Sequence, residues 1–164
     1  MDVAPEIAER AVQPYAGISR WVTMSAVGSV ADRIPEIFGW LSARGITPAG
    51  PPFFRYHVID MERQLLVEAG VPVASAVEDD GEIRGGTLPA GRFAVMTHTG
   101  APETLVAATA ALLDWAEARG VGWDVSQADA GEKWGCRLEF YLTDPAEQPD
   151  TSKWQTELAF RLAD

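Results

Sequence analysis

The chain has 164 residues, of which 47% are hydrophobic and 23% are charged, as in an ordinary globular domain. Asp and Glu number 24 against 13 Lys and Arg, and the resulting net charge of −11 argues against binding to nucleic acid. The N-terminal segment MDVAPEIAER lacks the basic-then-apolar order of a signal peptide, and no apolar stretch is long enough to span a membrane. We therefore expect a single cytoplasmic domain that contacts neither nucleic acid nor a membrane.

Few side chains suit a metal ion or a disulfide. Cys136 is the only cysteine, which excludes an internal disulfide and a zinc site built on several cysteines. The two histidines, His57 and His98, lack the spacing of a metal-binding helix. The acidic segment 78–86 (EDDGEIRGG) lacks the ligand spacing of an EF-hand and is expected to form a hairpin turn. We expect no metal and no cofactor.

Three blocks of sequence recur in the same order, which indicates a duplicated unit. Residues 20–28 (RWVTMSAVG) resemble 92–100 (RFAVMTHTG), residues 38–46 (FGWLSARGI) resemble 113–121 (LDWAEARGV), and residues 54–60 (FRYHVID) resemble 138–144 (LEFYLTD). We expect one repeat over residues 6–74, a hairpin connection over 75–89 and a second repeat over 90–164, all within one domain.

The first repeat is expected to fold as strand, helix, strand, strand. Apolar residues from Val30 to Leu41 recur on one helical face and predict its helix. Ser29 with Asp32 suggests a capping box at the start, and Pro35 predicts a kinked or separate first turn. Residues 65–73 are expected to form the closing strand.

The second repeat is expected to follow the same order, with a helix that begins near Pro102 and ends at Gly120, as the first helix ends at Gly45. In the following strand, residues 136–143, Leu138 and its even-numbered neighbours face one way and Glu139 and the odd-numbered residues face the other. Residues 154–162 are expected to close the repeat. Together these elements predict an α+β fold, in which tandem βαββ units form one antiparallel sheet with two helices.

Five segments taken in order, QPYAGISRWVTM (13–24), GPPFFRYHVID (50–60), VEAGVPV (67–73), LPAGRFAVMTHTG (88–100) and EFYLTDP (139–145), span nearly the whole chain. In this series the chain resembles the GyrI-like small-molecule-binding family, the effector-binding domain of AraC-type and multidrug-responsive bacterial regulators. The resemblance implies a central ligand groove between the two units and lipophilic, often cationic, ligands. It also implies a ligand-binding carboxylate in an E-x-Y context, matched here by Glu139 and Tyr141, and an acidic position matched by Glu68.

A carboxylate in an aromatic-walled pocket selects a delocalised cation through its charge and the ring faces together. From the strand alone, a solvent-facing position of Glu139 is the simpler interpretation, and the family resemblance favours the pocket. Further candidate ligand-binding residues, mostly aromatic, are Trp21, Trp40, Phe93, Trp115, Trp134 and Trp154. The tryptophans of the two helices flank the apolar stripes, where they can line a groove or merely cover the edge of the sheet.

Alignment of the repeats pairs Glu139 with Arg55 and Tyr141 with His57, so these two residues are also candidate ligand contacts. If all four side chains face one groove, Arg55 would neutralise Glu139 in the absence of ligand. The alternative is an ordinary surface ion pair, which contributes about 0–1 kcal/mol.

Three functions remain open from the sequence. The first is a stand-alone binding protein that sequesters or senses a hydrophobic, often cationic, small molecule. The second is a hydrolase of strained electrophiles, an activity that the family resemblance allows, with Glu139 and Tyr141 as catalytic residues. The third is an acidic inhibitor of a protein partner such as gyrase. Only about 17 residues precede the first repeat block, so we expect no DNA-reading head on this chain.

Overall fold

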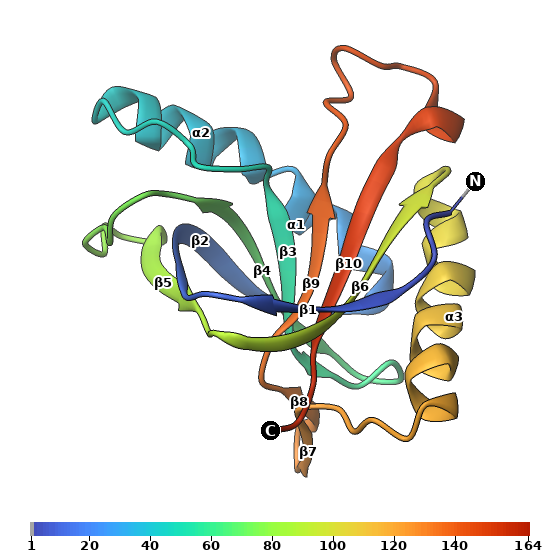
Figure 1. Cartoon of the computed structure of the whole chain (residues 1–164). Helices are drawn as coiled ribbons and strands as arrows, with labels where there is room; N and C mark the ends of the chain where they lie inside the picture. The colour runs from blue at the N-terminus through green and yellow to red at the C-terminus, as the bar shows by residue number, and fades with distance from the viewer. Residues whose placement is uncertain (1) are drawn as a thin grey trace.

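The computed structural model describes residues 2–164, which form one curled antiparallel sheet with its helices on one face (Figure 1). The strands are β1 (Glu6–Arg10), β2 (Gln13–Val22), β3 (Phe53–Ile59), β4 (Leu65–Pro72), β5 (Arg84–Leu88), β6 (Gly91–Thr99), β7 (Val125–Ala128), β8 (Gly131–Trp134), β9 (Arg137–Tyr141) and β10 (Gln155–Arg161). The helices are α1 (Gly28–Ala31), α2 (Ile34–Ala43) and α3 (Leu105–Ala118). This confirms the predicted α+β class.

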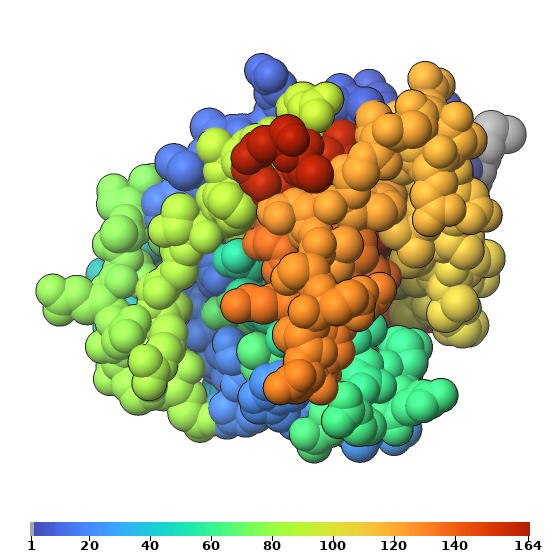
Figure 2. Space-filling model, turned by 90° about the horizontal axis from the view of Figure 1, so that it is seen from below, coloured from blue at the N-terminus to red at the C-terminus, as the bar shows by residue number. Residues whose placement is uncertain are grey.

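The strand order along the sheet is β1-β6-β10-β9-β3-β4-β2-β5. β3 and β9, the equivalent strands of the two halves, pair at the centre of the sheet. One edge strand is exchanged: β1 of the first repeat pairs with β6 of the second, whereas β5, from the connection between the repeats, pairs with β2 of the first. β7 and β8 form an additional hairpin that pairs with the end of β3. Seen from below, this hairpin lies between the segment around β5 and α3 (Figure 2).

Within residues 2–164, three hydrophobic cores lie on the two faces of the sheet. α2 packs on β2 and β4 and buries Ile37 and Leu41 in the first core, whereas α3 packs on β6 and buries Leu112 in the second. The third core lies on the helix-free face of the sheet and contains Phe53 and Phe93. Because each helix covers the outer strands of its own half, the central strands β3 and β9 lie between them (Figure 1).

The helix boundaries follow the expected residues with one exception. Pro35 lies in the first turn of α2, and α1 is a separate short helix, as Pro35 predicted. Gly45 and Gly120 have φ angles of 66° and 72°, the left-handed conformation expected after a helix. The predicted capping box at Ser29 is wrong, because the chain is already helical before α1 and the Ser29 hydroxyl donates to the carbonyl of Ala26.

Gly70 is a position where the sheet leaves no room for a side chain. A Cβ at Gly70 would overlap the ring of the fully buried Phe53. We expect Gly70→Ala to lower the free energy of unfolding by about 1–3 kcal/mol, the usual cost of overpacking a core. Gly39→Ala is the matched control: it places a Cβ in open space within α2 and should raise stability by about 0.5–1 kcal/mol. Urea denaturation of both variants checks this, and equal stability of the two would contradict it.

Candidate ligand-binding site

The side chains of β3 and β9 that point toward the helices form what we call the inter-helix face, made of Phe54, Tyr56, Arg137, Glu139 and Tyr141. The register places Phe54, Glu139 and Leu158 side by side across β3, β9 and β10. Phe54 belongs to the α2 core and Leu158 to the α3 core. Glu139 therefore lies where the two cores meet.

Glu139 is half-buried and hydrogen-bonded through only one of its oxygens. Oε1 accepts hydrogen bonds from the hydroxyls of Tyr141 (2.9 Å) and Tyr56 (3.1 Å). Oε2 has no partner within residues 2–164, and it is not among the fully buried atoms without one, so it remains accessible. Burial raises the pKa of Glu139, although the two tyrosine hydrogen bonds and the charge of Arg137 partly oppose the rise.

Tyr56 and Tyr141 act as hydrogen-bond donors to the Glu139 carboxylate. Burial and the neighbouring charge of Glu139 raise the pKa of both hydroxyls, so they keep their protons. The ring of Tyr141 packs edge-on against Phe54 with the centroids 5.4 Å apart. Tyr56 and Tyr141 are therefore held by hydrophobic contacts with the α2 core and by their hydrogen bonds to Glu139.

Tyr56 is not predicted by the repeat alignment, because that alignment pairs Glu139 with Arg55 and Tyr141 with His57. In the structure the residues of β3 on the matching face are Phe54, which lies beside Glu139, and Tyr56, which donates to the same carboxylate oxygen as Tyr141. A β-bulge between Tyr56 and Val58 adds one residue to β3, which shifts the alignment upstream of it. Allowing for such a bulge would have identified Tyr56 from the strand alternation.

Arg55 and His57 lie in a different network, around Glu68. Oε1 of Glu68 accepts from the Tyr15 hydroxyl (2.5 Å) and is 2.8 Å from Nε2 of His57. Arg55 donates to the Tyr15 hydroxyl (3.1 Å) and to the carbonyl of Gly135 (3.0 Å). Arg55 forms no ion pair with Glu139, and the charged group that acts on that carboxylate is Arg137.

The aromatic candidates are distributed over the molecule. Trp134 is buried in the α3 core and Trp115 packs against it, whereas Phe93 lies in the helix-free core. Trp40 donates its indole N–H to Asp80 (2.9 Å), and Trp154 donates to the carbonyl of Gln148 (2.7 Å). The side chain of Trp21 is 48% exposed at the end of β2. Of these residues, Trp134 is joined to the inter-helix face, because the Arg137 guanidinium stacks on its ring.

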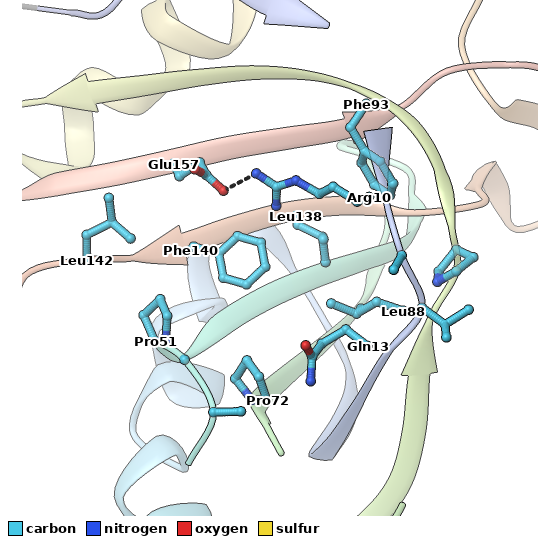
Figure 3. A pocket seen from close by; sticks show the side chains of 15 residues that line it. Arg10, Gln13, Pro51, Pro72, Leu88, Phe93, Leu138, Phe140, Leu142 and Glu157 are labelled. Carbon is cyan, nitrogen blue, oxygen red and sulfur yellow. Dashed lines mark hydrogen bonds and ion pairs between the residues drawn. The ribbon is translucent and has the colours of Figure 1, made fainter. Parts of the chain in front are cut away.

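The opposite face of β9 lines a cavity of about 460 Å³, which we call the concave pocket (Figure 3). Its walls include Leu138, Phe140 and Phe93. Arg10 pairs with Glu157 at 2.6 Å and lies above the rings of Phe93 and Phe140. Successive residues of β9 therefore face two different candidate sites, Glu139 and Tyr141 the inter-helix face and Leu138 and Phe140 the concave pocket.

Two features are absent from residues 2–164. No helix there is long and apolar enough to cross a membrane. In the same part of the chain, no group of three or more His, Cys, Asp or Glu side chains is arranged to hold a metal ion.

A model of the GyrI-like small molecule binding domain matches residues 4–163, so the chain belongs to the GyrI-like family. Comparison with curated protein sequences gave no match. The fold is similar to that of the EcmrR C-terminal domain, with a TM-score of 0.76, 19% identity and 98% of both chains covered. The alignment spans 57% of the longer EcmrR chain in its DNA complex.

Two other solved structures share the fold. One is SAV2435 bound to tetraphenylphosphonium, with a TM-score of 0.62, 9% identity, and 98% of this chain and 94% of that chain covered. The other is a hydrolase from Listeria innocua, with a TM-score of 0.62, 16% identity, and 97% and 91% covered.

Proposed function

We propose that this protein binds a hydrophobic cation on the inter-helix face, with Glu139 as the opposing charge. The observation that carries this proposal is a half-buried carboxylate with one oxygen held by two tyrosines and the other left accessible. Burial penalises the ionised carboxylate, and a cation beside Oε2 would remove part of that penalty. The rings of Tyr141 and Phe54 supply apolar surface for the rest of the ligand.

Charge and family membership support the same conclusion. The net charge of −11 favours the approach of cations, and GyrI-like domains are small-molecule-binding domains. SAV2435, which shares the fold, has been captured with a lipophilic cation. We infer that the protein sequesters or senses such molecules.

Titration with tetraphenylphosphonium tests the proposal by isothermal calorimetry. We expect saturable binding with one cation per chain. Val12→Trp is the matched control, because Val12 is exposed and lines the concave pocket, so a tryptophan there would obstruct that pocket alone. Binding should survive this substitution. The absence of saturable heat with the unmodified protein, or loss of binding in Val12→Trp, would contradict the proposed site.

Hydrolysis of strained electrophiles, whose strain lies in a small ring, is a second candidate function, favoured by the raised pKa of Glu139, which makes it a stronger base. Glu139 would take a proton from water as the water oxygen bonds to a ring carbon. The ring bond to that carbon breaks as the new bond forms, and the electron pair left on the other ring atom takes a proton from Tyr141. Glu139 then returns the proton that it took from water to the Tyr141 oxygen. The raised pKa of Tyr141 makes it a poor acid, and for this reason we place binding first.

Incubation with an activated cyclopropane, followed by mass spectrometry of the products, separates the two functions. A hydrolase would open the ring, and Glu139→Gln would slow the reaction at least about 100-fold, the contribution of a general base. Ring opening that is undiminished in Glu139→Gln would exclude this mechanism. Saturable binding without turnover would leave binding as the function.

A further inference from the structure

Arg137 lies two residues before Glu139 on β9 and on the same face of the strand. Its guanidinium stacks over the rings of Trp134 and Phe160, at 4.8 Å and 4.6 Å from their centroids. Within residues 2–164 no hydrogen bond or ion pair joins this guanidinium to another group. Burial lowers the pKa of Arg137, and the nearby acidic groups, Glu139 first, oppose this effect.

The surroundings of Arg137 contain more donors than acceptors. A guanidinium has five N–H donors, and the indole N–H of the buried Trp134 also lacks an acceptor. The closest carboxylate along the strand, Glu139, already accepts two tyrosine hydrogen bonds on Oε1. No nitrogen of Arg137 is among the fully buried atoms without a partner, so the guanidinium can be reached from outside.

We propose that Arg137 is a second ligand anchor, which binds an anionic group on the same molecule whose cationic part faces Glu139. Residues two apart on a strand are separated by about 6.6–6.8 Å, and this sets the spacing of the two ligand groups. The preferred ligands are therefore flat aromatic zwitterions rather than simple cations. This inference rests on the proposed function, since it uses the same face.

The preference follows from electrostatics in a half-buried site. A simple cation beside Glu139 also lies close to the positive charge of Arg137 and leaves its donors unpaired. A carboxylate on the ligand removes both penalties and forms charge-assisted hydrogen bonds, which are stronger than neutral ones. Arg137 then sets specificity, whereas Glu139 sets the sign of the charge that enters.

Rhodamine 110 and its methyl ester, rhodamine 123, test this inference. The two dyes share one cationic ring system, and only the first carries a free carboxylate. We expect fluorescence anisotropy to show about tenfold tighter binding of rhodamine 110, and Arg137→Gln to abolish that preference. Arg119→Gln is the matched control, because Arg119 also stacks on a tryptophan, Trp115, but lies at the end of α3. This control should keep the preference.

The dye titrations separate failure of the Arg137 proposal from failure of the proposed function. Equal binding of the two dyes, tighter binding of the ester, or a preference that persists in Arg137→Gln would overturn the role of Arg137 and leave the proposed function standing. If neither dye nor tetraphenylphosphonium binds, the proposed function itself fails. Arg137→Met retains the apolar stem on Trp134 and Phe160, and it replaces Arg137→Gln if that variant does not fold.

Discussion

Glu139→Gln is expected to weaken tetraphenylphosphonium binding about 30-fold, equivalent to about 2 kcal/mol, the cost of removing one partner of a desolvated charge pair. Glutamine keeps the shape of the side chain and can still accept from Tyr56 and Tyr141. Glu157→Gln is the matched control, because Glu157 lies at the concave pocket and pairs with Arg10. The affinity of Glu157→Gln for tetraphenylphosphonium should stay within about twofold of that of the unmodified protein. Similar losses in the two variants would contradict the site.

The pH dependence of this binding follows from the raised pKa of Glu139. A cation requires the ionised carboxylate, so affinity should be constant above the folded-state pKa and fall as the pH drops through it. Glu139→Gln should lose this dependence. Without ligand the sign reverses: a raised folded-state pKa favours the protonated form, so the contribution of Glu139 to stability increases as the pH falls. Calorimetric titrations at several pH values check the first statement, and urea denaturation checks the second.

Glu68→Leu is expected to lower the free energy of unfolding by about 3 kcal/mol, because it breaks a buried, charged hydrogen-bond network. The Tyr15 hydroxyl would lose its acceptor, and His57 would lose its partner. Glu147→Leu, at an exposed loop position, is the control and should change stability by less than about 0.5 kcal/mol. Equal effects of the two substitutions, measured by urea denaturation, would show that the network contributes nothing.

The same carboxylate gives the protein an acid-sensitive stability. Burial alone would raise the pKa of Glu68, but the hydrogen bonds from His57 and Tyr15 and the charge of Arg55 outweigh it and hold the pKa below its ordinary value of 4.5. A depressed folded-state pKa means that the contribution is complete above the ordinary value and is lost as the pH falls through the folded-state value. Glu68→Leu should therefore flatten the stability profile below about pH 4.5.

Sequence periodicity predicted the central strand of the site well. The alternation of Leu138 and Phe140 with Glu139 and Tyr141 gives the two faces of β9 as they are found. On β3 the repeat alignment assigned Arg55 instead of Phe54 and Tyr56 to the equivalent face. The bulge after Tyr56 adds a residue that an alignment of the two sequences does not show. Local pattern fixes which residues share a face only until the first irregularity in a strand.

Long-range pairing could not be predicted in the same way. The sequence contains no signal that β1 joins the second half of the sheet and β5 the first, since each strand is compatible with either edge. This exchange carries Arg10 into the concave pocket, where it meets Glu157 far along the chain. Likewise, no motif in the sequence identifies Arg137 as a candidate ligand contact, because its position on Trp134 and Phe160 depends on tertiary packing.

A crystal structure of the protein with tetraphenylphosphonium tests the central claim most directly. The account predicts that the cation lies on the inter-helix face between α2 and α3, beside Oε2 of Glu139 and against the ring of Tyr141. A cation found in the concave pocket, against Phe93 and Phe140, would contradict it and move the binding site to the other side of the sheet.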